Sequence, residues 1–107
     1  MNYTNFLIRV ISQPERSIFN VNNEDIIYAE FIAKFYQYRN NAYTLCKIKV
    51  WGNLAYDVLR YYNKNDFLMV EGSLSTENST FEKLDINTSI NITASKIYPF
   101  ALMKKTK

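Results

Sequence analysis

The sequence predicts a small all-β domain that contains one short helix. Two observations lead to this prediction. Long stretches of the 107 residues alternate apolar and polar side chains with the two-residue period of a strand, and one segment has a helical period instead. A chain of this length corresponds to one domain with a single core. We therefore expect one domain over residues 1–100 and a loose basic tail over residues 101–107.

Two strands are predicted in the first third of the chain. The first covers Phe6 to Ile11 and ends before Pro14, which lacks the N–H group that a sheet ladder needs. A turn-forming cluster from Asn20 to Asp25 precedes a long second strand, Ile26 to Tyr38. The alternation in this second strand places its odd-numbered apolar residues inside and its even-numbered residues outside.

The third predicted strand has one unusual face. A hairpin turn at Arg39 to Asn41 leads into this strand. Its even-numbered residues, including Cys46, form an ordinary apolar face. The opposite face carries Tyr43, Leu45, Lys47, Lys49 and Trp51. Rings alternating with ammonium groups on a solvent-facing surface are typical of proteins that bind a flexible anionic polymer.

A helix and two strands complete the pattern. Between Gly52 and Asp66, apolar residues recur at i, i+1, i+4, i+5 and i+8, which predicts a helical stripe with Asn53 as its N-cap. Phe67 to Ser75 is predicted as a central strand, with Gly72 marking a bulge, and Ile86 to Tyr98 as the last strand. This order predicts a five-stranded OB-fold barrel with a helix between strands three and four.

Composition argues against several functional classes. The chain has no histidine, and its one cysteine lies on the predicted core face, so catalysis is not expected. It has no metal-ligand spacing and no glycine-rich phosphate loop, so neither a metal nor a cofactor is expected. No apolar run approaches the length that spans a bilayer, and no targeting segment precedes the domain.

Basic residues are segregated from acidic ones. The net charge is only +3, yet residues 31–56 contain four basic residues and no acidic one, and so do residues 86–107. Such segments allow a positive surface, for which an anionic polymer is the usual partner. Lysines that merely keep a sheet soluble would explain the same pattern.

Three segments carry a resemblance to a known family. They are IRVISQPE (Ile8 to Glu15), YAEFIAKF (Tyr28 to Phe35) and VWGNLAYDVLRYYNKNDFLMVEGSLST (Val50 to Thr76). In this order and spacing they resemble the bacterial and organellar single-stranded DNA-binding protein family, over about Phe6 to Phe100. The resemblance implies an OB fold, single-stranded DNA as partner, and homo-oligomers, dimers or tetramers, that wrap the strand. Two positions depart from the family pattern, because Ile8 and Asn65 stand where the family has glycine.

Resemblance and strand faces together select the candidate site. Trp51 matches a family aromatic that stacks on a base, and Arg9 matches a basic or polar position near DNA. Three further aromatic residues lie near the other stacking positions of the family. The lysines are expected to contact phosphates. The predicted nucleic-acid-binding residues are Arg9, Lys34, Tyr36, Tyr38, Arg39, Tyr43, Lys47, Lys49, Trp51 and Phe81.

We predict that the protein binds single-stranded DNA without sequence preference, in support of replication, repair or recombination. Two alternatives remain open: an RNA-binding or primosome-type OB subunit, and an oligomeric structural protein that has lost nucleic-acid binding. Bacterial members of the family end in an acidic tip that recruits replication enzymes. This chain ends in MKKTK, so recruitment by that route is not expected.

The composition also suggests a compartment. Asn, Ile, Lys, Tyr and Phe are abundant, and their codons are rich in A and T. A short, linker-free member with this composition resembles reading frames of algal plastid genomes. The predicted location is therefore the chloroplast stroma, with the bacterial cytoplasm as the alternative.

Overall fold

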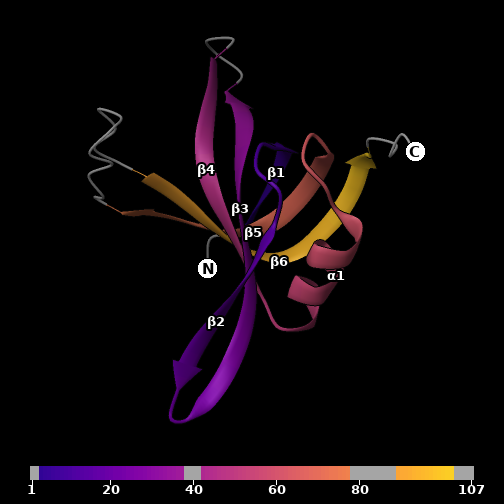
Figure 1. The fold of residues 1–107 in the computed structure, drawn as a ribbon. Coiled ribbons are helices and arrows are strands. Elements are labelled where there is room, and N and C mark those ends of the chain that lie inside the picture. Colours follow the sequence, from indigo (N-terminus) through magenta and orange to yellow (C-terminus); the bar gives the residue numbers. More distant parts are fainter. Residues whose placement is uncertain (1–2, 38–41, 78–88, 103–107) are drawn as a thin grey trace.

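Five strands of the chain close into a barrel. The computed structural model describes residues 3–37, 42–77 and 89–102. Around the barrel the strands follow the order β1-β5-β6-β4-β3, and β1 pairs with β3 to close the ring (Figure 1). This confirms the predicted five-stranded OB fold, with α1 between its third and fourth strands. The elements are β1 (Tyr3–Val10), β2 (Glu15–Val21), β3 (Glu24–Gln37), β4 (Ala42–Trp51), α1 (Asn53–Tyr61), β5 (Phe67–Glu77) and β6 (Ser89–Ala101).

The structure contains one strand more than the five predicted, β2. It pairs antiparallel with the first half of β3 and lies outside the closed ring. The predicted turn cluster is reduced to Asn22 and Asn23, which both have positive φ angles of 52° and 65°, as a tight hairpin turn requires. The β2–β3 hairpin extends away from the barrel, opposite to the far end of the β3–β4 hairpin (Figure 1).

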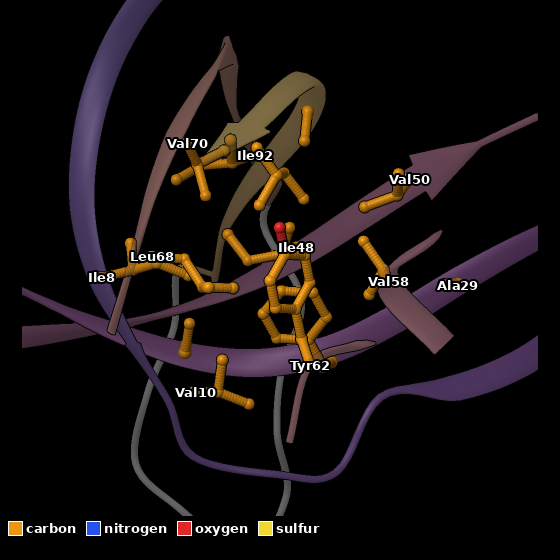
Figure 2. Close-up of a cluster of buried hydrophobic side chains, with 14 of the residues drawn as sticks. Ile8, Val10, Ala29, Ile48, Val50, Val58, Tyr62, Leu68, Val70 and Ile92 are labelled. Carbon is orange, nitrogen blue, oxygen red and sulfur yellow. The ribbon is translucent and has the colours of Figure 1, made fainter. Parts of the chain in front are cut away.

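The core fills the barrel and is closed on one side by the helix. Ala29, Phe31 and Ala33 of β3 and Cys46, Ile48 and Val50 of β4 are buried, as the alternation predicted, and Phe35 packs against this core. Val58 of α1 and Tyr62, directly after it, reach into the cluster formed by the strands (Figure 2). The helical stripe is thus confirmed. The predicted Asn53 cap is wrong, because Gly52 is the N-cap residue and no side chain caps this end.

The last two barrel strands contain the predicted bulge. The β5–β6 register shifts between Glu71 and Gly72. Gly72 is buried, and a Cβ at this position would meet the carbonyl oxygen of Thr93. β6 continues to Ala101, three residues beyond the predicted strand end, while residues 103–107 of the predicted tail lie outside the described residues.

The connection between α1 and β5 is held tightly against β1. The backbone N–H of Asn65 donates to the carbonyl oxygen of Val10 at 2.8 Å, and the Val10 N–H donates to the carbonyl oxygen of Asp66 at 2.9 Å. Asn65 has a φ of 78°, a left-handed conformation that glycine adopts freely and that asparagine tolerates better than most other residues. No helix within the described ranges is long and apolar enough to cross a membrane.

Candidate nucleic-acid interface

Every second residue of β3 faces one of β4 in two neighbouring columns, which we call the β3–β4 ladder. Antiparallel pairing sets each outward residue of β3 beside one of β4. From Tyr28 to Lys34 on β3 and from Leu45 to Trp51 on β4, buried residues alternate with the ladder residues, so these ladder residues belong to the face that points away from the core. The facing pairs are Tyr28 with Trp51, Glu30 with Lys49, Ile32 with Lys47, Lys34 with Leu45 and Tyr36 with Tyr43.

An aromatic cluster forms one end of the ladder. The rings of Tyr28 and Trp51 have centroids 4.6 Å apart and planes inclined by 37°. The two rings are therefore in contact, tilted against each other. Phe19 of β2 makes an edge contact with Trp51, at 6.2 Å and 82°. Trp51 remains 36% exposed, so part of the indole is available to a ligand.

Charged side chains occupy the middle of the ladder. The Lys49 Nζ atom lies 5.0 Å from the Tyr28 ring centroid and 5.7 Å from that of Trp51, within range of a cation–π interaction. Glu30 forms ion pairs with both neighbouring lysines: 3.7 Å to Lys47 and 3.9 Å to Lys49. These three side chains together carry a net charge of +1, beside an exposed aromatic ring.

Two more basic residues extend this surface toward β1. Arg9 is in register with Lys34 across the β1–β3 pairing. Its guanidinium carbon lies 5.4 Å from the ring centroid of Phe67, with which Arg9 is paired on β5. The buried Nε atom of Arg9 makes no hydrogen bond within the described part of the chain. Arg9 and Lys34 therefore add two basic residues in neighbouring strands beyond the middle of the ladder.

Five of the ten predicted site residues have described side chains, and the structure brings these five together. Arg9, Lys34, Lys47, Lys49 and Trp51 all lie on the outer face of neighbouring barrel strands. The backbones of Tyr36 and Tyr43 face each other at the far end of the ladder. Tyr38, Arg39 and Phe81 lie outside the described residues.

The predicted set lacked Tyr28, Glu30 and Phe19, which contact Trp51 or the two lysines beside it. Tyr28 and Glu30 follow the same outward alternation as Lys34, so the strand pattern could have included them. Phe19 could not have been included, because it reaches Trp51 only through the unpredicted strand β2.

The face has the chemistry of a binding surface. Exposed rings can stack on bases and ammonium groups can contact phosphates. The one nucleophile considered in the sequence, Cys46, is buried; its thiol donates to the carbonyl oxygen of Ala33 at 3.5 Å. Burial raises the pKa of this thiol to about 12, so it stays protonated at neutral pH. Among the described residues, no group of three His, Cys, Asp or Glu side chains is arranged to hold a metal ion.

Comparison with known proteins gives one clear sequence relative. No protein-family model matches the chain. Over 106 residues the chain is 38% identical to "Putative single-stranded DNA-binding protein ycf41" of Trieres chinensis. The match covers 95% of this chain and 91% of that protein.

Solved structures show the same fold at low sequence identity. The SSB domain of a Synechococcus sp. protein superposes with a TM-score of 0.68 at 18% identity, covering 92% of this chain and 94% of that one. The second single-stranded DNA-binding protein of Mycobacterium smegmatis gives 0.68 at 20%, covering 97% and 98%. Mitochondrial Rim1 of S. cerevisiae gives 0.68 at 15%, covering 97% and 100%.

Proposed function

The chain belongs to the single-stranded DNA-binding protein family, and on this basis we propose that it binds single-stranded DNA along the β3–β4 ladder. The proteins compared above are named for single-stranded DNA binding, and this chain is accordingly a binding protein and not an enzyme. Binding without sequence preference suits such a surface, because every base offers a flat face for stacking whereas the lysines contact only the backbone.

One observation carries the proposal: the exposed indole of Trp51 lies beside the ammonium group of Lys49. A base that stacks on the open part of the indole brings its phosphate near Lys49 and Lys47, which belong to the next two facing pairs of the ladder. Stacking of one base contributes about 1–3 kcal/mol. Phosphate contacts add an electrostatic contribution that weakens as salt rises. Neither contact depends on the identity of the base.

The intrinsic fluorescence of the protein tests this proposal directly. Trp51 is the one tryptophan of the chain, so its emission reports on the proposed site alone. Titration with oligo(dT) at low salt should quench this emission to a saturating level. Double-stranded DNA of the same length serves as the control and should quench it less. An emission that stays unchanged at low salt would refute binding at this face and favour the structural alternative.

Competition decides between DNA and RNA. Aromatic stacking accepts either polymer, and a protein distinguishes them through the 2′-hydroxyl. We propose DNA as the preferred ligand because the sequence relative is named for single-stranded DNA. Unlabelled oligo(dT) should then displace a bound, labelled oligo(dT) at lower concentration than oligo(U) does.

Assembly and location belong to the same proposal. We propose a homo-oligomer, dimer or tetramer, that supports replication, repair or recombination in the plastid stroma. The support is the family membership, the ycf41 relative and the composition rich in A/T-codon residues. Light scattering with and without oligo(dT) measures the assembly, and a monomer at micromolar concentration in both would contradict it.

A further inference from the structure

One carboxylate lies in the middle of the β3–β4 ladder. Glu30 shares the outward alternation of Tyr28 and Lys34, and it is the only acidic residue between them on this face of β3. Its two oxygens point to different lysines, Oε1 to Lys47 and Oε2 to Lys49. The side chain is about one-third exposed (30%), so it is neither a core residue nor fully solvated.

The two ion pairs are loose. Their N···O distances of 3.7 and 3.9 Å exceed the ~2.7–2.9 Å of a charge-assisted hydrogen bond. Each ammonium group therefore keeps N–H donors that can turn to another acceptor. A phosphate oxygen can take these donors at a shorter distance than Glu30 does.

Binding a phosphate here has an electrostatic cost. A phosphate that hydrogen-bonds Lys49 lies within about 7 Å of the Glu30 carboxylate, because the ion-pair distance and one hydrogen bond separate them. The two negative charges repel. Coulomb's law at this distance, with the dielectric response of a wet surface, makes binding about threefold to tenfold weaker than it would be without the carboxylate.

The neighbouring strand adds to this cost. Glu15 of β2 is the Cα partner of Glu30, and like charges directly opposite each other destabilise a sheet. In the free protein the lysines offset the negative charge of Glu30. When phosphates bind the lysines, the lysines offset less of the negative charge of Glu30. The repulsion between Glu30 and Glu15 is then less screened.

We propose that Glu30 competes with the phosphates of a bound strand for Lys47 and Lys49 and thereby lowers the affinity of the ladder. The inference rests on the proposed function and adds a residue that sets its strength. In the free protein, the one carboxylate forms ion pairs with both lysines. A strand must displace that carboxylate in order to bind and is released more readily because of it.

The variant Glu30→Gln tests the proposal, because it keeps the shape of the side chain and removes its charge. Its matched control is Glu71→Gln, which removes an equal charge from a lysine pair of similar length, 4.0 Å to Lys96, on the β5–β6 face. The carboxylates are similarly exposed, 34% for Glu71 against 30% for Glu30. Anisotropy of a labelled oligo(dT) should be titrated for both variants and the wild type across a series of salt concentrations, after thermal melts confirm folding.

Glu30→Gln should bind about threefold to tenfold more tightly than the wild type at low salt, and Glu71→Gln within about twofold of it. In the wild type, binding frees the Glu30 carboxylate, which takes up a cation from solution and offsets part of the counterion release. The amide of Glu30→Gln takes up no cation, so the slope of log K on log salt should steepen by up to about 0.7. Equal or weaker binding by Glu30→Gln would overturn the inference, and so would an equal gain in Glu71→Gln. A wild type that neither binds nor shows tryptophan quenching would instead refute the proposed function itself.

Discussion

Replacement of Trp51 by leucine removes the stacking surface on which the proposed function depends. Leucine keeps an apolar side chain beside Tyr28 and Phe19 but offers no flat ring. The structure limits the size of the effect. The Tyr28 ring packs against the indole with centroids 4.6 Å apart, so we expect at most one base to stack on Trp51. The expected loss is therefore one stacking increment of about 1–3 kcal/mol, which is about fivefold to 150-fold in affinity.

The assay must separate lost binding from lost folding. Anisotropy of a labelled oligo(dT) replaces intrinsic fluorescence, because Trp51→Leu removes the only tryptophan. Two aromatic contacts disappear, each contributing about 0.5–1.5 kcal/mol, so the melting temperature should fall by several degrees without unfolding the protein at 25 °C. Tyr56→Leu is the matched control, because this ring is 52% exposed but belongs to α1 and not to the ladder.

A Trp51→Leu variant that bound within twofold of the wild type would refute the stacking role. An equal loss of affinity in Tyr56→Leu would also refute it, because any exposed ring would then serve. A double variant with Tyr28→Leu gives a further check. Because the two rings are in contact, their effects on affinity should sum to more than the effect of the double variant.

Three further outcomes follow from the structure. Changing both Lys47 and Lys49 to glutamine should lower the slope of log K on log salt by about 1.4, and an unchanged slope would show that neither contacts a phosphate. Gly72→Ala should cost about 1–3 kcal/mol in the free energy of unfolding, measured with urea, because the new methyl group meets the Thr93 backbone. Burial raises the Cys46 pKa from 9.0 to about 12, so its contribution to stability is complete below pH 9 and declines as pH rises toward 12. The free energy of unfolding should therefore fall more steeply above pH 9 in the wild type than in Cys46→Ala.

The barrel could be predicted from the sequence because its strands have one buried face. From Tyr28 to Lys34 in β3 and from Leu45 to Trp51 in β4, a core residue alternates with a partly or fully exposed one, and that period is visible without a structure. Gly72 was predictable as a bulge for a related reason: a glycine inside a strand signals either a register shift or a close backbone approach, and here it marks both.

β2 could not be predicted from the sequence because it has no buried face. Six of its seven residues are exposed, since the hairpin that it forms with β3 extends beyond the barrel. No core therefore imposes an apolar alternation on the segment, and Pro14 directly before it favours a strand end. The contact of Phe19 with Trp51 depends on this strand, so it was hidden as well.

The ion pairs within the candidate site could not be predicted from the sequence, for a different reason. Alternation places Glu30, Lys47 and Lys49 on one face, but it does not tell which ammonium group a carboxylate will reach. That depends on strand register and on side-chain rotamers. Asn65 shows the converse case, in which a departure from the family pattern proves compatible with the backbone that the family requires.

The length of the β3–β4 ladder sets a stoichiometry. From the Tyr28–Trp51 pair to the Tyr36–Tyr43 pair, the ladder advances eight residues, or about 27 Å. At about one nucleotide per facing pair, each chain covers on the order of five nucleotides, near the lower end of the ~4–16 that an OB fold occupies. Saturating a gap of about a hundred nucleotides then consumes on the order of twenty chains. Under the proposed function, a footprint this short means that coating exposed DNA requires many copies of the protein.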